Sequence, residues 1–91
     1  MELSDILHST AFSVVENGTR AELPVLDAMA AAVAASSPGA AAALIDWDSS
    51  EVSRLRAFGV VHGLILYDIP ECDRAELLTA LLDLHRLVLV A

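Results

Sequence analysis

The sequence has few basic residues. Its cations are five arginines with no lysine, and thirteen acidic residues bring the formal net charge to −8. A protein that binds DNA or RNA needs basic side chains for its phosphate contacts. The charge balance therefore disfavours direct binding of nucleic acid and adhesion to an anionic membrane. It favours solubility, and it would steer a basic partner toward the chain.

Cysteines and long apolar runs are also scarce. Cys72, the only cysteine, has no second thiol to pair with, so nothing in the sequence demands an oxidising compartment. The longest purely apolar runs, residues 28–35 and 40–45, fall far short of the about 20 residues of a membrane-spanning helix. Residues 1–5 lack the basic and apolar regions of a signal peptide. A cytoplasmic protein outside the membrane is the default expectation.

Aromatic residues make up only 4% of the chain, although 56% of its residues are hydrophobic. Alanine, leucine and valine therefore supply most of the apolar surface. The mean hydropathy of +0.61 is high for a small soluble monomer, which indicates apolar surface shared with another chain. The length fits one helical domain over residues 1–91, with a single small core and too little chain for a large cleft.

Glycine, proline and Ser/Asp clusters divide the chain into helical stretches. We expect helices over about residues 4–16, 24–35, 38–45, 49–67 and 73–88. Ser4 is expected to cap the first helix and Gly18 to end it. Residues 19–22 form a capping-box pattern just before a proline, and Asp48 with Glu51 forms a similar pattern before the fourth helix.

The fold class predicted from this pattern is all-α, a small bundle of four to five helices. Residues 60–67 are rich in β-branched side chains and residues 86–91 are almost wholly apolar. They leave one alternative, an α+β fold with strands in these two segments. The apolar stripe assigned to the first helix includes Phe12 and Val15, and that of the fourth includes Val52. Arg54 and Arg56 fall outside that stripe.

No motif in the sequence supports catalysis, and no cofactor or metal is expected. The glycine-rich loops that hold nucleotide phosphates and the strand-turn-helix motif that exposes a catalytic serine are both absent. Asp5 and His8 supply only half of a carboxylate-bridged metal site on facing helices. Cys72 lies between Glu71 and Asp73, whose negative charges disfavour the reactive thiolate. We expect the chain not to be an enzyme.

Gly59 and Gly63 lie four residues apart inside an otherwise strong helix, where each costs about 1 kcal/mol relative to alanine. Two small residues at this spacing let helix backbones approach closely. Two partners are open for such a crossing: the alanine-rich second helix of the same chain, or a second copy of the chain. His62, between the glycines, is expected in the core or at an interface.

The last helix carries a second candidate interface. Leu77, Leu81, Leu84 and Val88 follow the spacing of a heptad seam, and about half of the helix surface is apolar. This helix is therefore expected at the centre of a monomer or along the axis of a homodimer. Trp47, on an acidic turn, is a candidate interaction hot spot. Its alternative is a ring folded over the edge of the core.

Together these features predict a non-catalytic protein–protein interaction module. It would be a self-associating accessory or regulatory subunit, present as a homodimer or docked on a larger protein. Two alternatives stay open. One is an acidic, antitoxin-like inhibitor that covers a basic site on another protein, and the other is a helical domain that binds a small ligand between its helices.

Overall fold

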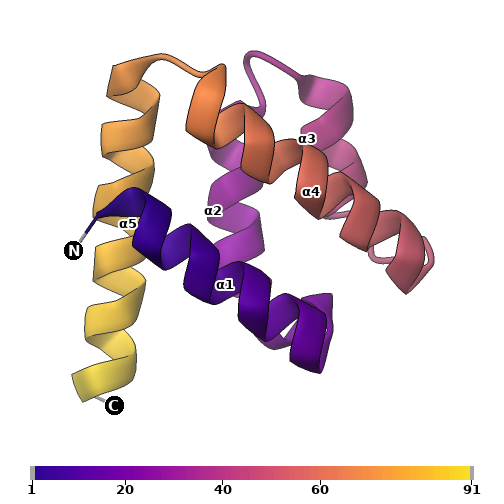
Figure 1. Ribbon diagram of the computed structural model, residues 1–91, viewed down its shortest axis with the longest axis horizontal. Coiled ribbons are helices and arrows are strands. Elements are labelled where there is room, and N and C mark those ends of the chain that lie inside the picture. Colours follow the sequence, from indigo (N-terminus) through magenta and orange to yellow (C-terminus); the bar gives the residue numbers. More distant parts are fainter. Residues whose placement is uncertain (1, 91) are drawn as a thin grey trace.

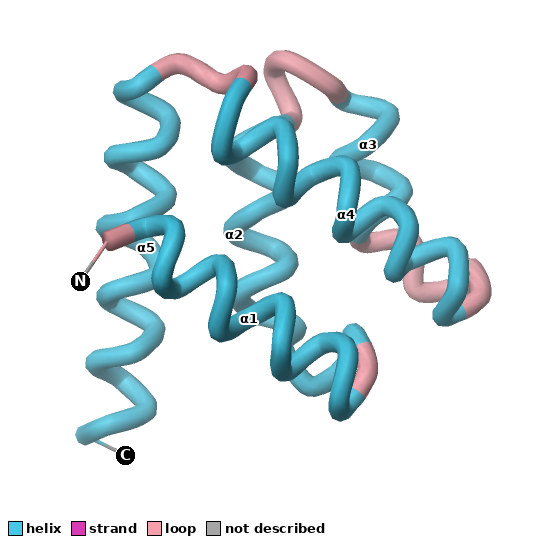
Figure 2. The backbone as a smooth tube through the Cα atoms, in the orientation of Figure 1, coloured by secondary structure: helices cyan, strands magenta, loops and turns pink. Residues whose placement is uncertain are grey.

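A computed structural model describes residues 2–90 of the chain, with side chains as far as Leu84. Its elements are α1 (Leu3–Asn17), the short 3-10 helix η1 (Thr19–Glu22), α2 (Leu23–Val33), α3 (Pro38–Leu44), α4 (Glu51–Tyr67) and α5 (Glu71–Val90). No strand occurs among the described residues (Figure 2). The all-α bundle is therefore confirmed. The α+β alternative is wrong, because residues 60–67 belong to α4 and residues 86–90 to α5; residue 91 lies outside the described residues.

Glycine and proline set several helix boundaries where the sequence predicts them. Gly18 adopts φ +91°, a left-handed conformation that favours glycine, and its N–H donates to the Val14 carbonyl at 2.9 Å. This is the expected end of α1. Pro24 and Pro38 each lie in the first turn of a helix, where the missing N–H has no intrahelical partner to lose.

The predicted helix caps are mostly wrong. Glu2, not Ser4, precedes α1, and its carbonyl accepts from the N–H groups of Asp5 and Ile6. The cap of α4 is Ser50, whose hydroxyl accepts from the Ser53 N–H at 3.2 Å, so the expected pattern of Asp48 with Glu51 does not form there. The last helix begins at Glu71, two residues earlier than expected, directly after a proline.

Residues 19–22 form a 3-10 helix and not a capping box. The reason is a long-range contact: the Thr19 hydroxyl donates to the Glu51 carboxylate at 2.7 Å. The hydroxyl is thereby drawn away from the backbone N–H groups that it would cap. The second helix consequently starts at Leu23, next to Pro24.

The helices form two layers. Figure 1 shows α1 and α4 in front and α2, α3 and α5 behind them. The Cα positions extend 32 × 29 × 17 Å, so the molecule is a flat slab and α1 and α4 lie along one of its broad sides. Between residues 2 and 90, no helix is both long enough and apolar enough to cross a membrane.

The core lies between the two layers around α2. Leu26, Met29 and Val33 of α2 are fully buried, and the packing neighbours of this helix are α3, α4 and α5. Ala30 of α2 and Ile69, between α4 and α5, are also buried, and the other helices contribute the remaining buried apolar residues: Leu7, Val14, Ala41, Leu44, Ala57, Phe58, Val61, Ile65, Leu77 and Leu81. Burial of these side chains, each worth about 1.5–3 kcal/mol for the larger ones, fixes which sides of α1 and α4 face the solvent.

Candidate functional site

The solvent side of the front layer is a candidate interaction surface. We call it the outer face, and it consists of His8, Phe12, Val15, Val52, Arg56, Gly59, Val60 and Gly63. On α4, Val52, Arg56, Gly59 and Gly63 follow each other at spacings of four, three and four and so share one side of the helix. Figure 1 is viewed onto this broad side, on which α1 and α4 are neighbours.

Large apolar side chains of the outer face are open to water. Phe12 is 69% exposed, Val15 76%, Val52 58% and Val60 56%. Single exposed apolar residues are common, but a contiguous group of them indicates a site of association. The structure corrects the predicted apolar stripes here, because Phe12, Val15 and Val52 were expected to face the core.

The two glycines of α4 make no close helix crossing within the described chain. A Cβ atom added at Gly59 or at Gly63 would meet nothing within 4 Å. The expected crossing against the alanine-rich second helix is therefore wrong, since that contact would place heavy atoms against these backbones. A crossing with a second copy stays a prediction. In this chain the two glycines leave the α4 backbone open, with Gly59 exposed and Gly63 half-buried.

His62 is half-buried on α4, on the side where His8 of α1 approaches. Its Nε2 is buried and has no hydrogen-bond partner among the described residues, and its ring lies 5.9 Å from the Phe58 ring, centroid to centroid. Burial lowers the pKa of His62 below the ordinary 6.5, and the nearby His8 lowers it further. Partial burial thus favours the neutral form of the side chain, because the charged form loses part of its hydration.

We predict that His62 weakens the fold in mild acid. A histidine with a lowered folded-state pKa takes up its proton more readily when unfolded, so stability is full above pH 6.5 and falls as pH drops below it. His62→Leu should remove this loss and raise the free energy of unfolding at pH 7.5 by about 1 kcal/mol, because an unpaired buried nitrogen is lost. Urea unfolding at pH 7.5 and pH 5.5 tests this. Equal pH dependence in the variant and the wild type would contradict it.

A buried polar cluster ties the start of η1 to the start of α4. Arg54 is only 4% exposed, although the sequence places it off the apolar stripe. Its Nη2 lies 2.9 Å from Glu51 Oε2, its Nε donates to Thr19 Oγ1 at 3.1 Å, and its Nη1 donates to the Ser49 carbonyl. Hydrogen bonds from Thr19 are the main reason that the pKa of Glu51 is lowered from 4.5.

Trp47 belongs to the same cluster. It is half-buried and packs against the core, and the guanidinium groups of Arg54 and Arg20 lie 5.1 and 5.5 Å from its ring centroid. Cations at this distance are attracted to the face of an indole. The ring is therefore folded over the core edge, as in the alternative stated for it, and a hot-spot role stays a prediction.

The seam of α5 lies mostly inside the chain. Leu77 is 3% exposed and Leu81 2%, while Leu84 is half-buried against the core. The side chain of Val88 lies outside the described residues. Because α2 and α1 already contact α5, burial of Leu77 and Leu81 requires no second chain. Of the predicted interface residues, only Gly59 and Gly63 lie together on the outer face.

Metal or thiol chemistry gains no geometric support. Among the described residues, no group of three or more His, Cys, Asp and Glu side chains is arranged to hold a metal ion. Cys72 is exposed and its thiol lies 3.9 Å from the Asp73 carboxylate, an anionic neighbour that disfavours the thiolate. That the chain is not an enzyme and carries no cofactor stays a prediction.

Comparison with known proteins yields no relative. No protein-family model, curated protein or solved structure matches the chain. The geometry of the outer face, the buried cluster and the cavities therefore carries the functional argument.

Proposed function

We propose that this chain is a non-catalytic protein–protein interaction module that self-associates through the outer face. The observation that carries the proposal is the exposure of Phe12, 69%, together with an α4 backbone at Gly59 and Gly63 that no part of the described chain covers. A ring that remains in water forfeits about 1.5–3 kcal/mol of burial free energy. A second copy that packs against this open backbone recovers it.

The dimensions of the outer face suit a dimer. A specific interface covers about 800 Å² on each partner, and the broad side of the slab measures 32 × 29 Å between its Cα extremes. In a two-fold dimer the same face meets itself, so each contact forms twice. In the proposed dimer, Phe12 of each copy packs against the Gly59–Gly63 backbone of the other, and Val15, Val52 and Val60 surround these two contacts.

The charges of the outer face also favour a second copy as the partner. The chain carries a net charge of −8, yet the outer face as defined above contains no acidic residue and carries the basic Arg56. Acidic side chains flank Phe12 on α1: Asp5 and Glu16 are both exposed. Arg56 of one copy therefore meets the acidic edge of the other copy's α1. An acidic inhibitor that covers a basic site would instead present carboxylates on this face, which favours self-association over that alternative.

Self-association is tested by replacing the aromatic anchor. We predict that wild-type protein has twice the 9.6 kDa chain mass and that Phe12→Ser has the mass of one chain. Two lost contacts of at least about 1.5 kcal/mol each weaken the dimer by about a hundredfold or more. The measurement is size exclusion with light scattering over a range of concentrations.

Ile45→Ser is the matched control, because Ile45 is 39% exposed but follows α3 in the back layer. It should keep the wild-type mass. A wild-type chain that stays at 9.6 kDa up to millimolar concentration, or a Phe12→Ser variant that keeps the dimer mass, would overturn the proposal.

A further inference from the structure

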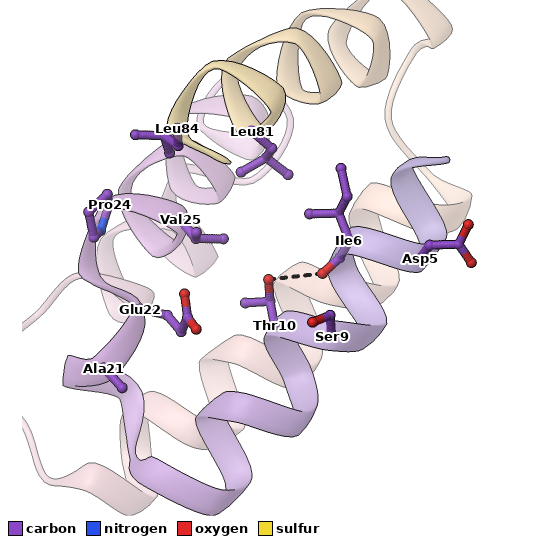
Figure 3. A pocket seen from close by; sticks show the side chains of 10 residues that line it. All are labelled: Asp5, Ile6, Ser9, Thr10, Ala21, Glu22, Pro24, Val25, Leu81 and Leu84. Carbon is purple, nitrogen blue, oxygen red and sulfur yellow. Dashed lines mark hydrogen bonds between the residues drawn. The ribbon is translucent and has the colours of Figure 1, made fainter. Parts of the chain in front are cut away.

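A cavity of about 530 Å³ lies on the side of α1 that faces away from α4. Figure 3 shows it between α1, the segment from η1 into α2, and α5. The volume lies within the range of small-ligand sites, about 300–1,000 Å³. None of the outer-face residues lines this cavity. Asp5, part of the acidic edge of α1, does line it, but the inference about the cavity does not use Asp5.

The cavity wall is mainly apolar. Ile6, Val25, Leu81 and Leu84 supply most of it, and in Figure 3 these four side chains converge from the three surrounding elements. Leu81 also belongs to the buried core, so this part of the wall is fixed by packing. A rigid apolar wall of this kind suits a compact hydrocarbon body.

The polar groups of the cavity offer acceptors to a ligand. Figure 3 shows the half-buried Glu22 carboxylate directed into the space between Thr10 and Val25. The Thr10 hydroxyl donates its proton to the Ile6 carbonyl at 2.9 Å, so toward the cavity its oxygen can only accept. The two ion pairs between described side chains engage Glu51 and Glu71, and among the described residues that line the cavity no side chain is cationic.

We propose that the cavity binds a small organic ammonium ion whose compact hydrocarbon body rests on Ile6, Val25, Leu81 and Leu84. Its ammonium group donates to the Glu22 carboxylate and to the oxygen of Thr10. An ammonium carries three donors and no acceptor, which complements the Glu22 carboxylate and the accepting oxygen of Thr10; the Ser9 hydroxyl in the lining can also accept. An uncharged ligand with the same body gains only the contacts with the apolar wall, and an anion is repelled by the Glu22 carboxylate.

The test compares three probes with the same body: 4-phenylbutylammonium, the neutral 4-phenylbutanol and the anion 4-phenylbutanoate. Each is titrated into the full-length protein and followed by the backbone amide signals of Ser9, Val25 and Leu84 in two-dimensional NMR. The ammonium should bind about fivefold more tightly than the alcohol, as expected for a half-buried ion pair. The anion should bind more weakly than either.

Glu22→Gln and Asp27→Asn complete the test. Each variant removes one negative charge, Glu22→Gln from the end of η1 and Asp27→Asn from α2. Asp27 is exposed and does not line the cavity. Glu22→Gln should reduce the affinity for the ammonium to that for the alcohol, whereas Asp27→Asn should leave the fivefold preference unchanged. Equal affinity for all three probes, no shift of the three amide signals, or an equal effect of both variants would overturn the proposal.

Discussion

Replacing Glu51 by alanine should lower the free energy of unfolding by about 3 kcal/mol, although the residue is partly exposed. The carboxylate accepts from the Thr19 N–H at 2.6 Å and from the Thr19 hydroxyl at 2.7 Å, and it pairs with Arg54 at 2.9 Å. Thr19 is fully buried and the Arg54 side chain is 5% exposed. The substitution thus removes the acceptor of three donors that belong to two buried residues.

Glu71→Ala is the matched control for this prediction. Glu71 pairs with Arg74 at the same i,i+3 spacing and at 2.6 Å, but the Glu71 side chain is 87% exposed. Exposed pairs contribute at most about 1 kcal/mol. Urea unfolding of both variants therefore separates the effect of burial from that of the ion pair itself. Equal costs for Glu51→Ala and Glu71→Ala would show that the Arg54 cluster does not hold the fold.

A double variant shows what the lost stability consists of. Arg54→Met removes the buried charge while keeping an unbranched side chain to cover Trp47. If Glu51→Ala destabilises chiefly by leaving Arg54 unpaired, then adding Arg54→Met should cost at least about 1 kcal/mol less than the sum of the two single changes. Additive costs would instead assign the loss to the two hydrogen bonds from Thr19.

The same cluster sets a pH dependence with a known sign. Because the pKa of Glu51 is lowered in the folded state, its contribution is complete above the unfolded-state value of about 4.5. It is lost as pH falls through the lowered folded-state value. The stability curves of wild type and Glu51→Ala should therefore approach each other in acid below pH 4.5, which the urea midpoint at a series of pH values measures.

The sequence predicts the helices well because their ends depend on local backbone chemistry. Gly18 and Pro24 act through φ alone, so their effect needs no knowledge of the fold. The caps are a different case. On local grounds Thr19 would cap the second helix, yet its hydroxyl donates to Glu51, 32 positions away in sequence. A choice between local and distant acceptors cannot be made from a local pattern.

The outer face could have been found by stricter use of helical periodicity. Phe12 lies five residues after the buried Leu7, an angle of about 140° around the helix, and Val52 lies nine residues before the buried Val61, about 180°. Both were assigned to the core because they are apolar and not because of their position. Arg54, in contrast, is three and four residues from the buried Ala57 and Phe58, so its position places it on the core side although its charge argues against it.

The sequence correctly predicts which side of α5 is buried, but it leaves open whether the same chain or a second copy buries it. A heptad pattern indicates that a helix side is buried and not what buries it. Leu77 and Leu81 face α2 and α1 of the same chain, whose contacts with α5 involve residues more than forty positions earlier. That long-range packing is absent from any pattern within the helix itself. A measurement that depends on how many chains associate can distinguish burial by the same chain from burial by a second copy.

Leu81→Ala should lower the free energy of unfolding by about 3 kcal/mol, the usual cost when a core leucine leaves a cavity. Leu82→Ala, at a half-buried position that is not part of the core, should cost about 1 kcal/mol, since cost follows burial. Both are measured by urea unfolding in the Phe12→Ser background, where the outer face no longer joins two copies. In that background the Leu81→Ala cost should be the same at every protein concentration, because Leu81 is covered by its own chain. A cost that grows with concentration would mean that a second chain covers the α5 seam, and the interface would then have to be moved from the outer face to α5.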